Sequence, residues 1–366
     1  MNSLERVMTA LRREQPDRVP VWELIVNQPV IDALYGDITY HDLVERELDG
    51  VTLVEDQRKE PVGEGLERDE WGIVWNPGDF DIPYAVGHPL ESWDDLDGYR
   101  APDAEADHRL ETLQIAVERF KGKKAIVFLG HDVYEFCAYL RGMDKLLMDF
   151  ALHPDKVHQL SRIVIDYKQR VMERALEMGA DIGLTGDDYA HRHAPMMSPA
   201  HFEQFIQPYL AEIVEVTHRA GAPFIKHTDG NIWPILDMMV DAGIDAIDPI
   251  EPIAGLDIGE VKDAYGDRIA VCGNVDCGEL LSRGTPEQVV EAVKETIAKA
   301  SPGGGHILAS SNSIHPAVRP ENYRAMLDAA AEFGEYPLDE KMVAEYREKS
   351  YIAQIGGQEY ADFKRF

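Results

Sequence analysis

The sequence predicts an α/β protein with one domain over residues 1–366, folded as a closed (β/α)8 barrel. Three observations lead to this fold class. Apolar runs typical of buried parallel strands recur along the chain, amphipathic helical patterns separate most of them, and counting from Val19 gives eight runs. An open doubly wound sheet is the alternative, because periodicity does not prove closure. No glycine-rich dinucleotide loop follows the first run, which weakens a nucleotide-binding interpretation.

Each expected strand is a short apolar run that ends in polar residues. In chain order the runs occupy residues 18–26, 51–56, 125–130, 182–188, 223–228, 245–251, 269–274 and 306–311. The helices expected between or beside them cover residues 39–48, 107–121, 153–179, 198–219, 235–242, 257–265 and 285–299. Thr285-Pro-Glu-Gln288 is a capping box with proline at the first helical position, so the start of the last of these helices is specified.

Residues 58–103 interrupt this alternation. Trp71-Gly-Ile-Val-Trp75 and Ile82-Pro-Tyr-Ala-Val86 flank the turn sequence Asn76-Pro-Gly-Asp79. Two apolar runs around a proline-glycine turn are typical of a β-hairpin. We therefore expect an N-terminal insertion that carries a hairpin and lies outside the barrel.

Composition limits the partners of the chain. The 36 basic and 67 acidic side chains give a net charge of −31, which argues against nucleic acid and anionic membranes as partners. No run of eighteen apolar residues occurs, and the first residues form an amphipathic helix with charges rather than a signal peptide. Three cysteines, in no metal-binding spacing, suit free thiols in a reducing compartment. The chain is therefore expected to be soluble and cytoplasmic.

The stretch Pro223-Phe-Ile-Lys-His-Thr-Asp-Gly-Asn231 is the candidate centre of a functional site. A short apolar run delivers His227 and Asp229 at its exit. Because residues two apart on a strand point to the same side, these two side chains can converge on one ligand or metal. The alternative is a packed histidine followed by an Asx-type turn or a helix cap.

Other expected strands also end in carboxylates, imidazoles and amides. These residues are Glu23 and Asn27; Glu55 and Asp56; His131, Asp132 and Tyr134; Asp187 and Asp188; Asp248 and Glu251; Asn274 and Asp276; Asn312, Ser313 and His315. In a closed barrel the carboxyl ends of the strands meet at one face, where active sites lie. The sequence therefore predicts a divalent-metal or acid/base site there.

Several of these residues also have a structural interpretation. Asp187 and Asp188 point in opposite directions in an extended chain, so we expect one to face the mouth and the other to bond the backbone. Asp248-Pro249 and Glu251 suit a strand stop as well as a functional role.

Motifs over nearly the whole chain resemble the uroporphyrinogen decarboxylase superfamily, and its cobamide-dependent methyltransferase branch more than the decarboxylases. They are Pro16-Asp-Arg-Val-Pro20, Leu140-Arg-Gly142, Gly186-Asp-Asp188, Ser198-Pro199 with Pro208-Tyr209, His227-Thr-Asp-Gly230, Gly273-Asn-Val-Asp276, and Ser310-Ser-Asn-Ser-Ile-His-Pro316 leading into Pro320-Glu-Asn322. The resemblance implies a TIM-type barrel, in agreement with the strand count.

Two departures from the family pattern separate its branches. The decarboxylases carry an arginine-bearing segment near the first strand that holds substrate carboxylates, whereas this chain reads Trp22-Glu-Leu-Ile-Val-Asn-Gln28. The thiol-alkylating methyltransferases bind zinc through a His-x-Cys pair and a later cysteine, whereas Asp229 and Asn312 stand at the thiolate positions here. Both uroporphyrinogen decarboxylation and thiol methylation are therefore disfavoured.

The remaining activity that the resemblance implies is transfer of a methyl group from a small O- or N-methyl donor to a corrinoid, the cobamide, on a partner protein. The expected catalytic residues are His227, Asp187 and Glu251, and the expected metal ligands are His227, Asp229 and Glu251, with zinc as the first choice. The expected substrate-binding residues are Glu23, Asn27, Tyr134, Asn274, Asn312 and His315.

Two other classes of function stay open. A decarboxylase or other lyase acting on a small acid or a porphyrinogen would use the same mouth without cobalt. A non-catalytic metal- or ligand-binding barrel is the other alternative. A homodimer is a possible assembly for any of the three.

Overall fold

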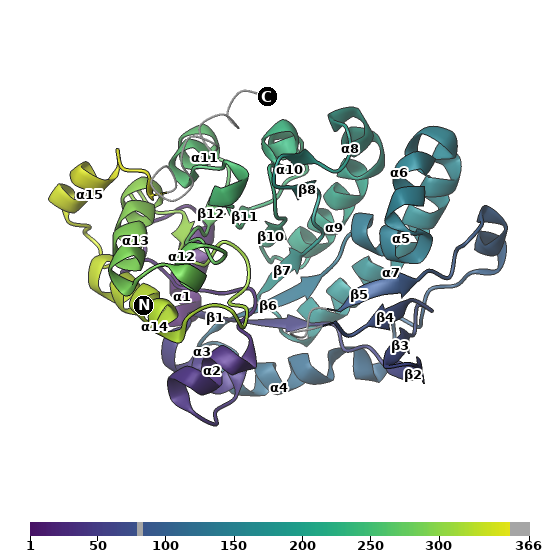
Figure 1. The fold of residues 1–366 in the computed structure, drawn as a ribbon, viewed down its shortest axis with the longest axis horizontal. Helices are drawn as coiled ribbons and strands as arrows, with labels where there is room; N and C mark the ends of the chain where they lie inside the picture. Colours follow the sequence, from purple (N-terminus) through teal and green to yellow (C-terminus); the bar gives the residue numbers. More distant parts are fainter. Residues whose placement is uncertain (79–82, 352–366) are drawn as a thin grey trace.

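The computed structural model describes residues 1–78 and 83–351 and contains a curved parallel sheet surrounded by helices (Figure 1). The sheet order is β1-β6-β7-β10-β11-β12-β13, and every neighbouring pair is parallel. The strands are β1 (Gly50–Val54), β6 (Ala125–Gly130), β7 (Ile182–Thr185), β10 (Phe224–His227), β11 (Ala246–Asp248), β12 (Ala270–Cys272) and β13 (His306–Ile307). This order is the sequential order of a (β/α)8 barrel, which confirms the predicted fold class.

The expected first strand, residues 18–26, forms isolated bridges rather than a ladder, parallel at Val21 and Val26 and antiparallel at Arg18, which corrects the count of eight regular strands. Trp22 N donates to Leu308 O at 3.1 Å, and Val21 O accepts from Asp49 N at 2.8 Å. The segment therefore bonds both edges of the seven-stranded sheet and closes it. A regular ladder does not form because Pro20 has no N–H and because the Val21 N–H donates to the Asp49 carboxylate.

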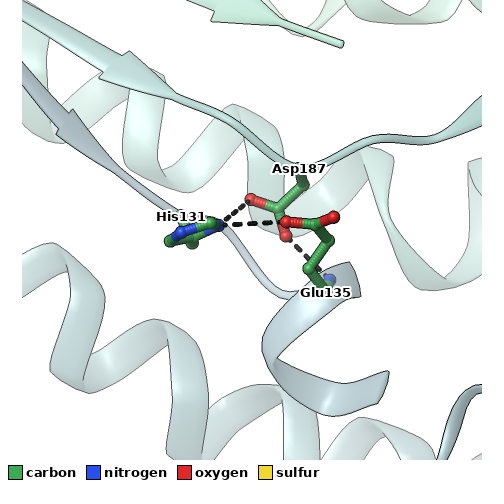
Figure 2. A group of neighbouring side chains, drawn as sticks. All are labelled: His131, Glu135 and Asp187. Atoms are coloured by element: carbon green, nitrogen blue, oxygen red, sulfur yellow. Dashed lines mark hydrogen bonds and ion pairs between the residues drawn. The ribbon is translucent and has the colours of Figure 1, made fainter. Parts of the chain in front are cut away.

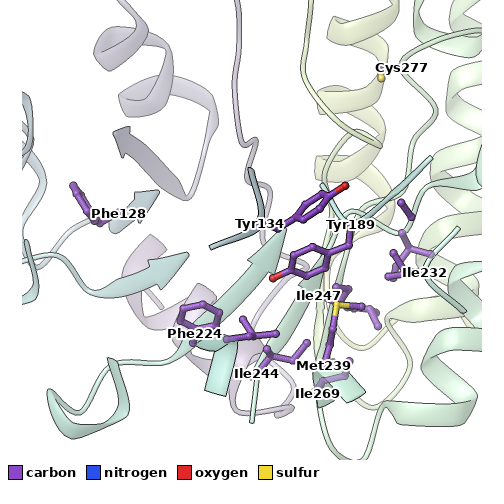
Figure 3. Close-up of a cluster of buried hydrophobic side chains, with 14 of the residues drawn as sticks. Phe128, Tyr134, Tyr189, Phe224, Ile232, Met239, Ile244, Ile247, Ile269 and Cys277 are labelled. Carbon is purple, nitrogen blue, oxygen red and sulfur yellow. The ribbon is translucent and has the colours of Figure 1, made fainter. Parts of the chain in front are cut away.

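Alternation along the strands produces two apolar cores. In β6, for example, Val127 belongs to the core inside the barrel and Phe128 to the core between sheet and helices. Residues of α1 (Ser3–Leu11) also pack into the interior core. Figure 3 shows part of the outer core, with Phe224, Ile247 and Met239 among the labelled side chains. Strands buried on both faces explain why the expected runs are continuously apolar.

Helices follow the strands as the sequence indicates. The expected ones correspond to α3 (Tyr40–Glu47), α4 (Glu111–Phe120), α7 (Pro154–Met178), α10 (Leu236–Asp241), α11 (Ile258–Tyr265) and α13 (Pro286–Ala300). The Thr285–Gln288 capping box at the start of α13 is confirmed. The helix expected over 198–219 is divided into α8 (Pro199–Phe205) and α9 (Gln207–Arg219), because Pro208 near the start of α9 cannot donate an i to i−4 bond.

Six α-helices among the described residues were not predicted from the sequence, the shortest of which is α12 (Leu280–Arg283). The other five are α2 (Gln28–Tyr35), α5 (Tyr134–Arg141), α6 (Met143–Leu152), α14 (Pro320–Phe333) and α15 (Glu340–Tyr346). Among these, α5 begins directly after β6, so its first turn lies at the carboxyl end of the sheet.

The insertion forms its own antiparallel sheet, in the order β2-β3-β4-β5. Its strands are β2 (Lys59–Gly63), β3 (Leu66–Asp69), β4 (Val74–Asn76) and β5 (Tyr84–Gly87). Buried Trp71 joins the insertion to the barrel, with ring centroids 5.0 Å from Phe136 and 4.7 Å from Tyr167. The end of the expected turn at Asn76–Asp79 and the start of the run at Ile82 lie outside the described residues, as do residues 352–366 of the expected single domain.

The described helices and cysteines bear on two further expectations. Within the described ranges, no helix combines the length and the apolar character needed to cross a membrane. Cys137, Cys272 and Cys277 are buried free thiols, as expected.

Candidate active site

The carboxyl ends of β7, β10 and β11 bring a histidine and several carboxylates together. In the sheet register His227 lies beside Asp248, and β7 lies on the other side of β10. The Nδ1 atom of His227 is 2.6 Å from Asp248 Oδ2, and its Nε2 atom is 3.7 Å from Asp229 Oδ1. His227 is therefore held on one side and faces a second carboxylate on the other.

The chain after β10 turns so that Asp229 stays over this histidine. Gly230 has a φ of +87°, and a Cβ atom there would lie 2.6 Å from the carbonyl carbon of Ala190. Only glycine fits this position without strain. The turn also directs the Gly230 N–H to Glu251 Oε2, at 2.7 Å. The glycine of the His227-Thr-Asp-Gly230 motif thus fixes the position of Asp229.

Three potential ligands gather at this turn, and we call them the His227 cluster: Asp188, His227 and Asp229. One ligand atom of each lies within 4.8 Å of the other two. Asp188 Oδ1 accepts the Asp229 N–H at 2.9 Å, and Asn312 Nδ2 donates to Asp229 Oδ2. Asp229 Oδ1 is buried and has no hydrogen-bond partner among the described residues.

Burial and charge shift the protonation of the His227 cluster. Burial lowers the pKa of His227, but the hydrogen bond that its ring N–H donates to Asp248 and the charges of Asp248, Asp229 and Asp188 outweigh it and raise the pKa to about 9. Burial, followed by the charge of Asp188, raises the pKa of Asp229 well above its ordinary range. Burial therefore disfavours the charged form of Asp229, and a cation at the cluster would favour it.

Glu251, an expected metal ligand, lies beside this cluster but is not one of its three members. Its Oε2 atom accepts from the Gly230 backbone, as a residue that stops a strand would. Burial raises the pKa of Glu251, and the neighbouring Asp188 adds to the shift. Among the described residues the structure thus groups Asp188, rather than Glu251, with His227 and Asp229.

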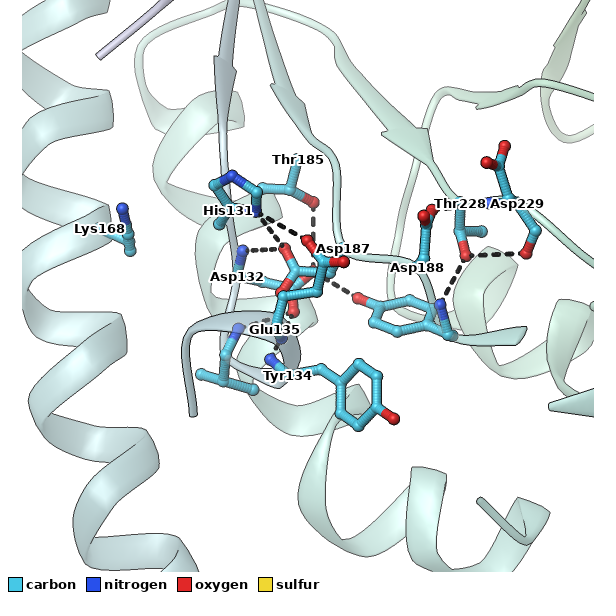
Figure 4. A network of polar contacts seen from close by, with 12 residues as sticks. His131, Asp132, Tyr134, Glu135, Lys168, Thr185, Asp187, Asp188, Thr228 and Asp229 are labelled. Atoms are coloured by element: carbon cyan, nitrogen blue, oxygen red, sulfur yellow. Dashed lines mark hydrogen bonds and ion pairs between the residues drawn. The ribbon is translucent and has the colours of Figure 1, made fainter. Parts of the chain in front are cut away.

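Asp187 belongs to a second group, the His131 cluster, which consists of His131, Glu135 and Asp187 (Figure 2). His131 Nδ1 lies 3.4 Å from Glu135 Oε2 and 3.5 Å from Asp187 Oδ2. The Asp187 carboxylate also accepts the backbone N–H groups of Asp132 and Glu135 at 2.6 and 2.8 Å, which satisfies the start of α5. The side chains of Asp187 and Asp188 belong to different clusters, and the carboxylates of both accept backbone N–H groups (Figure 4).

The His131 cluster is also electrostatically polarised. Burial lowers the pKa of His131, but interaction with the carboxylates of Asp187 and Glu135 raises it to about 9. Burial opposes ionisation of Asp187, yet the His131 interaction and the charge of Lys226 leave its pKa lowered. Asp187 therefore stays ionised near neutral pH and orients the imidazole.

Beneath both clusters lies a fully buried network that the sequence did not reveal. Lys226 Nζ lies 3.2 Å from Asp132 Oδ2 and 3.1 Å from the Asp187 carbonyl oxygen, and 4.1 Å from the centroid of the Tyr189 ring. The Tyr189 hydroxyl donates to Asp132, and so does the hydroxyl of Thr185, which is labelled in Figure 4. The network ties β6, β7 and β10 together. A single lysine within an apolar strand was the signal that could have indicated it.

Three of the residues expected to bind substrate are occupied by internal bonds. Glu23 is fully buried and accepts the Ser310 hydroxyl at 2.6 Å. The Tyr134 hydroxyl contacts Met143 Sδ at 3.0 Å, and Asn274 Oδ1 accepts from Thr296 at 3.1 Å.

The other three lie nearer the surface. Asn27 is half-buried and bonds through its backbone N–H to Ile314 O at 2.9 Å. His315 is half-buried, and its Nδ1 accepts from Ala317 N at 3.3 Å. Of the six expected substrate residues, only Asn312 bonds a member of the His227 cluster.

Comparison with known proteins agrees with this architecture. Residues 69–333 match the model of the family described as uroporphyrinogen decarboxylase (URO-D), and the chain belongs to that family. The uroporphyrinogen decarboxylase of Alkalilimnicola ehrlichii is 26% identical, with 89% of this chain and 93% of that protein covered. The enzyme of the same name from Nitrosococcus oceani is 24% identical, with coverages of 90% and 96%.

A solved structure shows the same fold. The methyltransferase from Methanosarcina mazei superposes with a TM-score of 0.73 at 23% identity and covers 91% of this chain and 99% of its own. At that identity the similarity establishes the barrel architecture. The predicted family and fold class are thereby confirmed.

Proposed function

We propose that this protein transfers a methyl group from a small O- or N-methyl donor to a corrinoid carried by a partner protein, with a divalent cation at the His227 cluster. The observation that carries the proposal is the buried Asp229 Oδ1 atom, which lacks a hydrogen-bond partner among the described residues and lies 3.7 Å from His227 Nε2. The structural similarity to a protein named a methyltransferase supports the choice of reaction.

The geometry of the cluster fits a metal such as zinc. Two ligands with bonds of about 2.1 Å stand about 3.4 Å apart around a tetrahedral ion, and the distance of 3.7 Å between Nε2 and Oδ1 is close to that value. Asp248 accepts a hydrogen bond from the other ring nitrogen, as carboxylates beside metal-bound histidines do. Asp188, His227 and Asp229 would hold the ion, and their nitrogen and oxygen atoms suit zinc, manganese or iron(II).

The reaction explains what the remaining residues do. The C–O or C–N bond breaks with its electron pair on the heteroatom while the methyl carbon bonds to reduced cobalt, so the heteroatom needs positive charge or a proton. A cation at the cluster would supply that charge as a Lewis acid. Glu251, with its raised pKa, can hold a proton on the oxygen that does not accept from Gly230. Asp187 acts through His131, which it orients.

The test combines metal analysis with an assay. Protein without a histidine tag is analysed for metal, and methylation of reduced cobalamin is followed spectroscopically with methoxy compounds and methylamines as donors. His227→Ala should remove the metal and the activity. His218→Ala is the matched control, because His218 is exposed on α9 and pairs with Asp245. Full metal content in His227→Ala, or no metal in the wild type under any condition, would refute the metal centre.

Decarboxylation is the second candidate, since the curated relatives are named uroporphyrinogen decarboxylases. The structure places buried Glu23 in the segment where the family resemblance implies arginines for substrate carboxylates. Arg141 is not a substitute, because it bonds Asp149 and stacks on Trp93. We expect no coproporphyrinogen from uroporphyrinogen in a standard assay, and measurable product would establish the decarboxylase instead.

A further inference from the structure

A cavity of about 250 Å³ lies at the carboxyl ends of β1 and β6, beside the insertion. Its walls come from the barrel strands, from α5 and α7, and from β4 of the insertion. The residues that determine its character are Val54, Trp75, Leu129, His131, Phe136 and Tyr139. No expected substrate-binding residue lines it.

Aromatic rings set at steep angles form the apolar wall. The Trp75 and Tyr139 ring centroids are 5.0 Å apart at 66°, and those of Phe136 and Tyr139 are 5.8 Å apart at 73°. Rings at these angles do not stack face to face on one another. Another flat ring can therefore contact their edges or faces. A dry cavity of about 150 Å³ holds benzene, so this volume accommodates one substituted ring and not two.

The charged groups in the wall are already paired with one another. Lys168 Nζ lies 3.1 Å from Glu55 Oε2 and 3.5 Å from the centre of the Phe136 ring. Glu55 also accepts the Tyr167 hydroxyl and lies 3.8 Å from Arg109 Nε. A charged ligand would therefore find no uncompensated counter-charge here, and the wall favours a neutral one.

Two polar groups in the wall are available to form a hydrogen bond with a ligand. His131 Nδ1 is buried against Glu135 and Asp187, whereas the side chain as a whole is 30% exposed and lines the cavity, so Nε2 is the ring nitrogen available there. Neither Nε2 nor the Gln57 amide has a hydrogen-bond partner among the described residues, and both line the cavity.

We propose that this cavity binds a neutral, single-ring aromatic compound with an oxygen substituent, of the phenol or aryl methyl ether class, with the ring against Trp75, Phe136 and Tyr139 and the oxygen bonded to His131 Nε2. The His131 cluster at the oxygen end and the His227 cluster are joined through the chain, since Asp187 of the first and Asp188 of the second are consecutive residues. The proposal that the compound binds depends only on the cavity. Its identification as the methyl-donor site rests on the proposed function.

The test measures binding without any corrinoid. Phenol, 2-methoxyphenol, toluene and cyclohexanol are titrated by calorimetry into the full-length protein, and occupancy of the cavity is checked by ligand-observed NMR. We expect one site for 2-methoxyphenol and phenol, with toluene and cyclohexanol at least about tenfold weaker, since each lacks either the hydrogen bond or the ring. Equal binding of cyclohexanol, or no binding of any ring compound, overturns the proposal.

Variants localise the site. Trp75→Leu removes one wall and should weaken 2-methoxyphenol about five- to tenfold, and His131→Asn should abolish the preference for phenol over toluene. Trp233→Leu is the matched control, because Trp233 is a half-buried tryptophan that contacts Tyr265 and does not line the cavity. Melting temperatures show whether each variant is folded. Weakening by Trp233→Leu equal to that by Trp75→Leu also overturns the proposal.

The experiments distinguish a failure of the proposed ligand cavity from a failure of the proposed methyl transfer. If 2-methoxyphenol binds as expected and no donor methylates cobalamin, the cavity stands and the proposed methyl transfer fails. If aliphatic donors alone react and Trp75→Leu leaves their rates unchanged, methyl transfer stands and the cavity is not the donor site.

Discussion

His227 Nδ1 and Asp248 Oδ2 lie 2.6 Å apart, on adjacent strands and at paired positions of the sheet register. This contact fixes the ring so that Nε2 faces Asp229. Both residues are buried, which makes the orientation hard to change. Asp248 is therefore a positioning residue for the candidate metal centre.

Replacing Asp248 by Asn should lower metal affinity about 10- to 100-fold while the fold is retained, because an amide orients the imidazole but contributes no negative charge. Chelator competition at fixed pH measures the change. Asp241→Asn is the control, since Asp241 is exposed on α10 and pairs with Arg268. An unchanged metal affinity in Asp248→Asn would show that His227 is not a ligand.

Asp188 and Glu251 are the two candidates for the third metal ligand, and substituting each in turn shows which one binds the metal. Asp188→Ala should abolish metal binding, because its carboxylate lies within ligand distance of His227 and Asp229. Glu251→Gln should retain the metal, since Glu251 bonds the Gly230 backbone. Metal content by mass spectrometry distinguishes them, and the reverse result would restore Glu251 as the ligand predicted from the sequence.

Glu23 should make the protein less stable as the pH rises through the neutral range. Burial raises its pKa from 4.5 to about 8, against the bonds from Ser310, so the folded state binds more protons than the unfolded state between those values. The free energy of unfolding contributed by this group therefore falls from about pH 4.5 to pH 8 and is constant above. Glu23→Gln should flatten that dependence in urea titrations. A variant as pH-sensitive as the wild type would contradict it.

His306 should destabilise the protein in acid. Burial lowers its pKa to about 4, and its ring is neutral: Nε2 donates to the Gly273 carbonyl at 3.0 Å, and Nδ1 accepts from Ser301 at 2.7 Å. The unfolded state binds more protons between pH 6.5 and 4, so stability is fully present above pH 6.5 and is lost as the pH falls.

The check is a comparison of urea midpoints. His306→Asn should be less stable than the wild type at pH 7 but should lose less stability between pH 6.5 and 4. Parallel curves for the two proteins would show that His306 does not cause the acid sensitivity.

Local patterns determined much of the fold. The runs that became β6 and β10, the helix α7 and the capping box at Thr285 are readable from sequence, because alternation and helix caps depend on residues within a few positions of each other. The irregular closure of the sheet by residues 18–26 could not be predicted from the sequence. It depends on Asp49, a residue far along the chain, taking the Val21 N–H.

The candidate site, too, was predicted from the sequence in part and decided by the tertiary structure in part. Residue spacing predicted that His227 and Asp229 lie on one side and that Asp187 and Asp188 diverge, because both relations depend only on residues one or two positions apart. In the structure Asp229 follows the end of β10, and Asp187 and Asp188 follow the end of β7. Which carboxylate completes each cluster was decided by the tertiary structure. The register of β10 between β7 and β11 brings Asp188 and Asp248 to His227, the turn at Gly230 engages Glu251, and the first turn of α5 supplies Glu135 to His131. These contacts join strands and helices distant in sequence, so only the packed barrel determines them.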